Sequence, residues 1–134
     1  MRYKLIVIAL LLIGISGCKK DPDTVPAGRV RLMINVNHHG INIPNAIVFR
    51  KDSILIFPGQ DTTLYTQRYV TDESGNLIID QLGNGERAMV LYAKGIDPSW
   101  DSTQQTPVWG YQFVNINTAI GESKDVTVII PVSE

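Results

Sequence analysis

The sequence contains a single cysteine, Cys18, and it precedes the region that we expect to fold. A folded domain without a thiol has no disulfide, no cysteine-based zinc site and no cysteine nucleophile. Charge of one sign is also lacking, since 12 Lys and Arg side chains stand against 13 Asp and Glu side chains. A nucleic-acid-binding domain normally carries a basic excess, so we expect no nucleic-acid partner.

Long apolar runs are scarce, and the longest is near the start of the chain. Leu5–Ile13 is unbroken and follows two positive side chains, Arg2 and Lys4. A membrane-spanning helix needs about 20 apolar residues, so this run is too short to be one. Its length and its preceding charge are typical of a signal peptide. We therefore expect residues 1–17 to be a leader that is removed.

The apolar run leads into Ile15, Ser16, Gly17 and Cys18, which resemble the lipobox of bacterial lipoproteins. The resemblance implies that the Cys18 sulfur receives diacylglycerol, that the chain is cut before Cys18, and that the new amine is acylated. One myristoyl-sized chain binds a bilayer only marginally, whereas three chains would hold firmly. The alternatives are an ordinary secretory signal with an incidental cysteine, and an uncleaved membrane helix.

Residues 18–28 are predicted to be the lipidated N-terminus and a linker. Loss of Arg2 and Lys4 with the leader shifts the formal net charge from −1 to −3. The segment Cys18–Asp21 looks like the start of many Bacteroidota lipoproteins, which implies lipid anchoring at the outer membrane and leaves open the periplasmic or surface face. The alternative is a solvated linker whose charges carry no address.

Residues 29–134 alternate apolar and polar side chains in short stretches separated by turn residues, which is the pattern of half-buried strands. Glu86–Lys94 is apolar on both faces and is expected to be a central strand. The pattern predicts a single all-β sandwich of seven to eight strands, transthyretin-like or immunoglobulin-like. The predicted strands are Val30–Val36, Ala46–Lys51, Leu64–Val70, Asn76–Leu82, Glu86–Lys94, Pro107–Asn117 and Asp125–Val132.

Two segments interrupt this regular pattern. Ser53–Thr63 is irregular, and Ile54–Phe57 within it is either a short strand or a hydrophobic flap. Gly95–Thr106 is expected to be the longest loop, and it contains Asp97, Trp100 and Asp101.

Three turn motifs resemble those of carboxypeptidase regulatory-like domains, which are related to transthyretin and to repeats of collagen adhesins. They are Pro44–Val48, Thr71–Leu77 and Leu82–Gly85. The resemblance covers about half of the mature chain. The chain departs from the family pattern at Arg87, where the family usually has tyrosine, and by the insertion Asp52–Thr63. Because the first strand carries arginines, at positions 29 and 31, in place of lysine, we expect no internal isopeptide bond.

The sequence lacks the usual catalytic motifs, with no Gly-x-Ser-x-Gly elbow, no His-Glu-x-x-His pair and no phosphate loop. Adjacent side chains on an extended chain point to opposite sides, so His38 and His39 are a poor chelating pair and are expected in a solvated turn. Asp72 and Glu73 lack the alternating oxygen ligands of a calcium loop. We therefore expect no enzyme activity, no metal and no cofactor.

Aromatic side chains are the better indication of function. Trp109, Tyr111 and Phe113 share one face of a predicted strand, where they either fill the core or form an exposed platform for sugar or peptide. Trp100, with Asp97 and Asp101 nearby, is the first candidate for contact with a ligand. The predicted function is a lipid-anchored envelope module that binds a glycan or a protein, and the alternative is a structural component that holds a partner protein by strand pairing.

Overall fold

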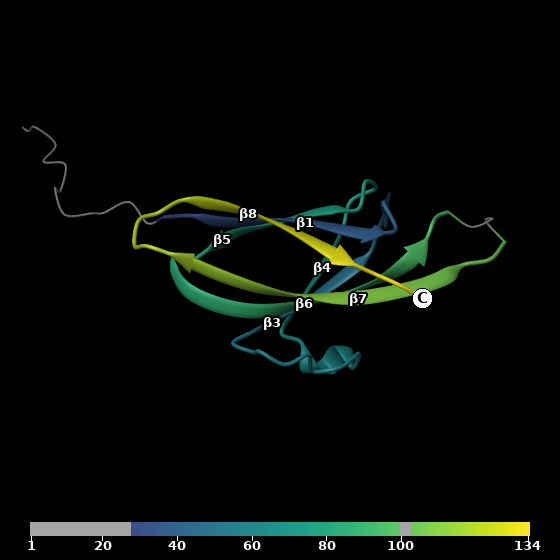
Figure 1. Cartoon of the computed structure of the whole chain (residues 1–134), viewed down its shortest axis with the longest axis horizontal. Coiled ribbons are helices and arrows are strands. Elements are labelled where there is room, and N and C mark those ends of the chain that lie inside the picture. The colour runs from purple at the N-terminus through teal and green to yellow at the C-terminus, as the bar shows by residue number, and fades with distance from the viewer. Residues whose placement is uncertain (1–27, 100–102) are drawn as a thin grey trace, which may run out of the picture.

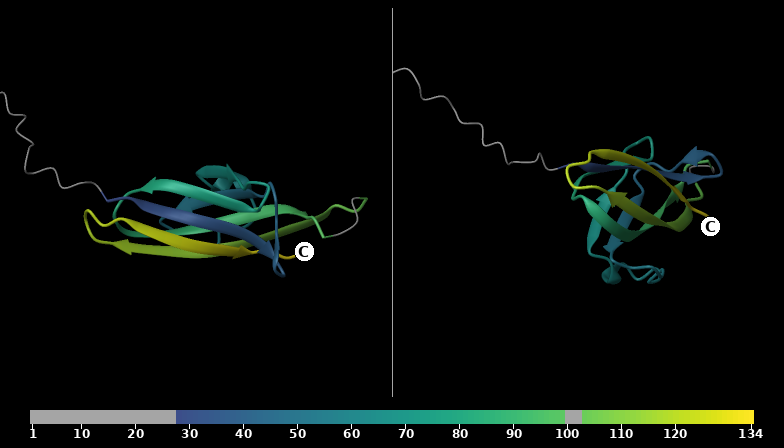
Figure 2. Two further views of the ribbon diagram at one scale, coloured as in Figure 1. Left: turned by 90° about the horizontal axis from the view of Figure 1, so that it is seen from above. Right: turned by 60° about the vertical axis from the view of Figure 1, so that its left-hand side comes forward.

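A computed structural model describes residues 28–99 and 103–134, and these form two β-sheets packed face to face (Figure 1). The predicted all-β sandwich of seven to eight strands is therefore confirmed. Figure 2 shows the same two layers from above and, on the right, turned part of the way toward one end. The strands are β1 (Val30–His38), β2 (Ile41–Asn42), β3 (Ile47–Asp52), β4 (Gln67–Val70), β5 (Asn76–Leu82), β6 (Gly85–Asp97), β7 (Thr106–Thr118) and β8 (Lys124–Pro131).

The first sheet is built around β1. Strand β8 pairs with β1 in parallel, β5 pairs with β1 in antiparallel register, and the short β2 pairs with the last two residues of β1, also antiparallel. The second sheet has the order β4-β3-β6-β7, and all of its pairs are antiparallel. As predicted, β6 is a central strand of this sheet.

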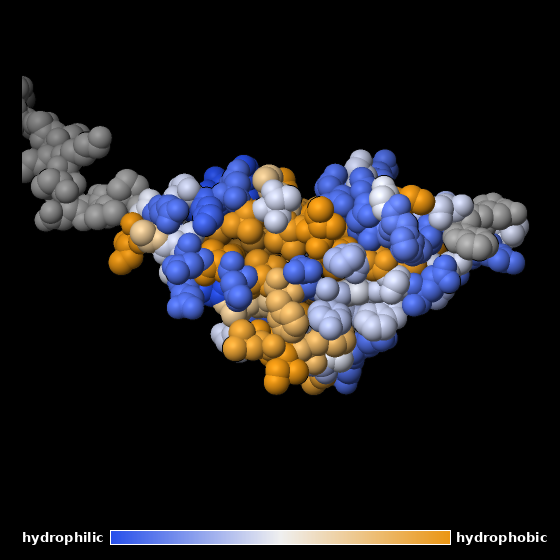
Figure 3. Space-filling view, viewed as in Figure 1, coloured by the Kyte–Doolittle hydropathy of each residue, from blue (hydrophilic) through white to orange (hydrophobic). Residues whose placement is uncertain are grey.

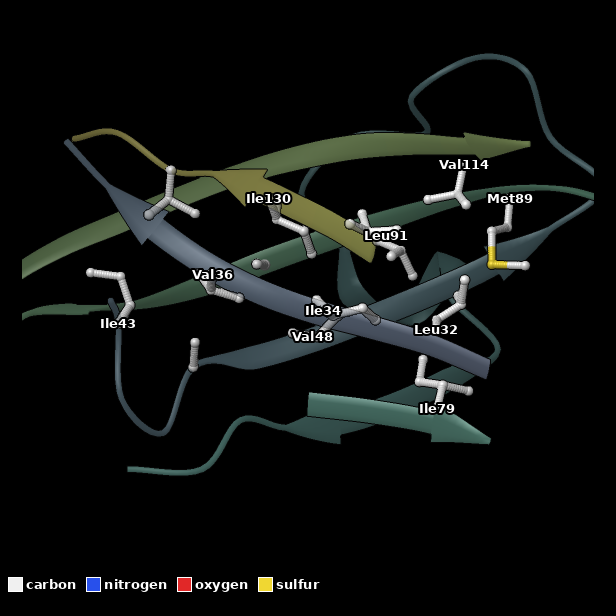
Figure 4. Packing of buried hydrophobic residues seen from close by; sticks show 14 of the residues in the cluster. Leu32, Ile34, Val36, Ile43, Val48, Ile79, Met89, Leu91, Val114 and Ile130 are labelled. Atoms are coloured by element: carbon white, nitrogen blue, oxygen red, sulfur yellow. The ribbon is translucent and has the colours of Figure 1, made fainter. Parts of the chain in front are cut away.

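The core lies between the two sheets and follows directly from the period-two pattern. In β1, Val30, Leu32, Ile34 and Val36 are all at most 2% exposed, while the residues between them are half-buried. Figure 4 shows how these side chains meet those of the facing sheet. The labelled partners from the second sheet are Val48, Met89, Leu91 and Val114.

The motif in Thr71–Leu77 forms a tight turn, but it is not the turn of a β-hairpin, because it joins β4 of the second sheet to β5 of the first. The Asp72 carboxylate accepts hydrogen bonds from the backbone N–H groups of Ser74, at 2.8 Å, and Asn76, at 2.9 Å. Gly75 has a φ of 73°, a conformation that L-residues with a Cβ rarely adopt. The carboxylate therefore organises the turn.

The segment between β3 and β4 differs from the prediction. The expected strand Leu64–Val70 begins only at Gln67, because a 3₁₀ turn, η1 (Thr62–Leu64), comes first, with Asp61 capping it. Of the two alternatives for Ile54–Phe57, the strand is wrong and the flap is confirmed. Residues 53–66 fold back across the outer face of the second sheet, and we call this segment the flap (Figure 1).

The chain enters the sandwich at one end of its long axis. Gly28 lies against Glu122 and Asn84, in the turns that join β7 to β8 and β5 to β6. The opposite end carries the start of β3, the end of β6 and the start of β7 (Figures 1 and 2). At about 3.3 Å per residue, Gly85 and Lys94 of β6 are about 30 Å apart along the strand. The two ends are therefore well separated.

Candidate functional site: an aromatic face and its groove

The register of the second sheet arranges its outward side chains in rows. Phe49, Tyr92 and Tyr111 form one row, because each is the direct cross-strand partner of the next. All three point away from the intersheet core, since inward positions alternate with outward ones. The outer face of this sheet is thus built from rings.

The flap covers this row. The ring of Phe57 stacks on Tyr111, with centroids 4.1 Å apart and planes 7° from parallel, and it also contacts Tyr92 at 5.9 Å. Tyr65 stacks on Tyr92 at 5.6 Å and meets Phe49 at 5.9 Å. These contacts explain why β6 is apolar on both faces, since the core buries one face and the flap buries the other.

Burial under the flap affects the tyrosine hydroxyls. The phenol of Tyr65 donates a hydrogen bond to the Gly59 carbonyl at 2.8 Å, within the flap itself. Desolvation, with a smaller contribution from Tyr92, raises the pKa of Tyr65 to about 12. Desolvation also raises the pKa of Tyr92. Both rings are therefore neutral at physiological pH, and they serve as packing surfaces.

The next row of the outer face is left open. Ile47, Lys94 and Trp109 are cross-strand partners, and Ile96 and Pro107 form the row beyond them. The flap only borders these two rows, with the Phe57 ring stacked beside Trp109 at 6.4 Å, and a groove of about 670 Å³ remains there. Its lining residues are Pro44, Asn45, Ile47, Gln60, Tyr92, Lys94, Gly95, Ile96, Pro98, Pro107, Val108 and Trp109.

The groove is apolar with a few polar groups at its rim. The rim carries the amides of Asn45 and Gln60 and the ammonium of Lys94, which lies 5.5 Å from the centre of the Phe49 ring. Among the described lining residues there is no carboxylate, so Lys94 supplies the only formal charge. Ligand sites are typically apolar hollows with a few placed polar groups, and this groove fits that pattern.

The question that the sequence left open about Trp109, Tyr111 and Phe113 is resolved. The three rings lie on the outer face and do not fill the core, which on β7 is built from Val108, Val114 and Ile116. Tyr111 and Phe113 are 40% and 37% exposed. The flap covers part of this aromatic face, since Phe57 stacks on Tyr111. Of the three rings, only Trp109 lines the groove.

Apolar side chains also continue onto the outside of the flap. Leu55 and Ile56 are 75% and 76% exposed. Figure 3 shows apolar surface both on the flap and between the two layers of the sandwich.

Asp97 corrects two predictions. It is the last residue of β6 rather than part of a loop, and it is 3% exposed. Its carboxylate accepts hydrogen bonds from the Ser99 backbone at 2.8 Å and hydroxyl at 2.6 Å, and His38 Nδ1 lies 2.8 Å away. The predicted solvated turn is therefore wrong for His38, which is 8% exposed, and applies only to His39.

These hydrogen bonds change the acidity of Asp97. The Ser99 donors, with a smaller contribution from His38, hold the pKa of the Asp97 carboxyl below its ordinary value. Because an ionised carboxylate only accepts, the proton of this pair resides on His38 Nδ1. The pair ties the end of β1 to the end of β6.

Several predicted site residues lie outside the described residues. These are Trp100 and Asp101, and the lipobox residues Ile15, Ser16, Gly17 and Cys18. In the ranges that the structure does describe, no helix has the length and apolar character to cross a bilayer. The same ranges contain no group of three or more His, Cys, Asp and Glu side chains placed to hold a metal ion.

A second hollow lies between the open edges of β7 and β8. At one end Trp109 and Ser133 exchange backbone hydrogen bonds of 2.9 Å, which joins the two sheets. Further along, the strands diverge around a cleft of about 310 Å³. It is lined by Gln112, Phe113, Val114, Asn115, Val126, Thr127, Val128 and Ile129.

Comparison of the chain with models of protein families finds no match, and a search of curated proteins finds none either. Membership of the lipoprotein and carboxypeptidase regulatory-like families therefore stays a prediction from the residues.

Sequence reasoning did not identify the groove. Its residues come from three separate segments, 44–47, 92–98 and 107–109, together with Gln60 of the flap. The cross-strand register brings these segments together, and no local pattern encodes that register. The available signal was the aromatic alternation in Pro107–Asn117, which placed Trp109 on a ring-bearing face without showing that the face is outward.

Proposed function

We propose that this protein is a non-catalytic, lipid-anchored binding module of the bacterial outer membrane. In this proposal, Cys18 carries the lipid and the linker 18–28 tethers the sandwich. The groove beside Trp109 then binds a ligand, a glycan or a protein, outside the membrane surface.

The position of the groove supports this proposal most strongly. Gly28 lies beside the β7–β8 turn, and the groove is lined by the strand ends at the opposite end of the long axis. Figure 2 shows these two ends of the sandwich. A domain held at its Gly28 end would present the groove away from the bilayer. Stability alone does not require an open apolar groove at that position.

The lining residues suit binding rather than bond cleavage. They offer ring faces, proline edges and amides, and the described lining contains no His, Asp, Glu, Ser or Cys. Those five side chains supply most general acids, bases and nucleophiles. The groove therefore has the composition of a recognition surface.

The proposal is tested with the mature lipidated protein in phosphatidylcholine vesicles, which are floated with labelled soluble polysaccharides and with labelled envelope proteins. Trp109→Ala should lower binding of the retained probe at least about tenfold, which corresponds to about 1.4 kcal/mol. Phe113→Ala is the comparison variant, because Phe113 is on the same strand face but lines the β7–β8 cleft and not the groove, so a loss of binding in Phe113→Ala alone would contradict the proposal. Equal binding by wild type and both variants would contradict the proposal.

A second candidate is a structural role through strand pairing, and the β7–β8 cleft favours it. Lys124 and Val132 donate backbone hydrogen bonds to β1, so the even residues of β8 face β1. The odd residues, including Thr127 and Ile129, therefore point their N–H groups to the open edge. An added strand could pair there, as strands do at other exposed sheet edges.

This alternative has its own variant. Thr127→Pro removes one N–H from the open edge and leaves the pairing with β1 intact. Under the structural role, Thr127→Pro should abolish retention of a partner protein, and Trp109→Ala should not. The opposite result would favour the groove.

A further inference from the structure

The floor of the groove is an apolar surface that includes an aromatic ring. Trp109 is half-buried beside Ile96 and Pro107, and the closely packed Tyr92 closes the floor next to the flap. An aromatic face of this kind suits a ligand that has a flat patch of C–H groups, because such contacts combine apolar burial with attraction to the ring.

The backbone of the floor is already paired on both sides at two positions, Lys94 and Trp109. Lys94 pairs with Ile47 on one side and Trp109 on the other, so the β6 ladder is complete there. The outer edge of Trp109 is used as well, since its N–H and C=O bond to Ser133 at 2.9 Å. An extended peptide would thus find no free ladder to join at these two residues. Recognition there depends on side chains, which favours a saccharide over an added strand.

The rim matches a saccharide that carries negative charge. In the described part of the chain, the side-chain amides of Asn45 and Gln60 make no hydrogen bond to protein, so they are available to sugar hydroxyls. An amide both donates and accepts, as hydroxyl groups require. Among the lining residues that the structure describes, Lys94 is the only charged one, and none of them is a carboxylate that would repel an anion. The ammonium would attract a carboxylate on the ligand.

We propose that the groove binds an acidic saccharide of the uronate class. Trp109 stacks on a sugar ring, Asn45 and Gln60 bond its hydroxyls, and Lys94 pairs with a uronate carboxylate. The groove volume of about 670 Å³ accommodates a short oligosaccharide segment. This inference rests on the proposed function and specifies the ligand class of the same site.

The experiment uses the mature lipidated protein in phosphatidylcholine vesicles. The chain contains two tryptophans, so Trp100→Phe leaves Trp109 as the only one, and its fluorescence then reports on the groove. The probes are oligomers of galacturonate, oligomers of mannuronate and hyaluronan oligomers. Each is compared with its methyl ester, which keeps the sugar and removes the charge.

At least one acid oligomer should bind ten-fold or more tightly than its ester, and raising the salt concentration should weaken that preference. Lys94→Gln should reduce binding of the acid to the level of the ester. Lys124→Gln is the matched control, since Lys124 is also exposed but belongs to the other sheet, and it should change nothing.

Other outcomes separate this inference from the function on which it rests. If acid and ester bind equally and Trp109→Ala abolishes both, the groove is a binding site and the acidic class is wrong. If oligoglutamate binds as tightly as the uronates, the saccharide class is wrong. If no uronate changes the Trp109 fluorescence, the inference is overturned, and the flotation assay with other polysaccharides and proteins still decides the proposed function.

Discussion

The ring of Phe57 lies parallel on the ring of Tyr111, with planes 7° apart and centroids 4.1 Å apart. This stack joins the middle of the flap to β7, while Tyr65 joins its far end to β6 and β3. The flap is therefore attached to the sheet by its aromatic side chains, and its position defines one wall of the groove through Gln60.

Phe57→Ala should loosen the flap. The variant loses the stack and part of the apolar cover of Tyr92, and we expect a loss of about 1–2 kcal/mol in the free energy of unfolding. Urea denaturation measures this loss, and limited proteolysis should show faster cleavage within 53–66. Leu55→Ala, at a side chain 75% exposed, should change stability by less than about 0.5 kcal/mol. Equal effects of the two variants would show that the stack does not hold the flap.

Because of Tyr65, the free energy of unfolding should decrease at alkaline pH. Its pKa is raised from 10.0 to about 12 in the folded state, so the folded state binds the phenol proton more tightly than the unfolded state does. The resulting stability is complete below pH 10 and is lost as the pH rises toward 12. Tyr65→Phe should flatten the pH dependence of unfolding in this window. The difference in phenolate absorbance between wild type and Tyr65→Phe follows the ionisation of Tyr65, and a difference that develops at pH 10 would contradict the burial of this ring.

Alternation predicts much of the fold but does not say which face is inward. In β1 the choice is clear, because one face is aliphatic and the other is polar. In β7 both faces are apolar, with Val108, Val114 and Ile116 on one and Trp109, Tyr111 and Phe113 on the other. The two-residue alternation shows which residues share a face of β7. Which of the two faces packs in the intersheet core depends on where the other sheet and the flap lie. The His38–Asp97 pair spans 59 residues of sequence and has no local signal.

Because of Asp97, the free energy of unfolding should decrease as the pH falls into the acid range. Its pKa is lowered in the folded state by Ser99 and, to a smaller extent, by His38. The contribution is present above the unfolded pKa of about 3.9 and is lost as the pH falls through the lower folded value. Asp97→Asn should reduce stability at pH 7 and shrink the further loss on acidification.

Ser99→Ala provides the graded comparison for Asp97. The variant removes one donor and keeps the carboxylate, so the pKa of Asp97, followed by NMR of its carboxyl carbon, should move back toward its ordinary value. A pKa unchanged by Ser99→Ala would contradict the assigned cause.

Gly110 is required where β7 passes the end of β8. A Cβ on Gly110 would lie 1.9 Å from the Pro131 carbonyl oxygen, so the backbones would have to separate. We expect Gly110→Ala to cost about 1–3 kcal/mol in thermal or urea unfolding. Gly83→Ala is the control, since its Cβ would meet only the end of the Arg87 side chain at 3.5 Å. Its stability should stay within about 1 kcal/mol of wild type.

The tether is the part of this account on which the location and the proposed role both depend. The most direct test is intact and peptide mass spectrometry of the protein purified from its native membranes. We expect a mature chain that begins at Cys18, with diacylglycerol on the sulfur and an acyl group on the new amine. A free thiol at Cys18, or a chain that begins elsewhere, would contradict the account.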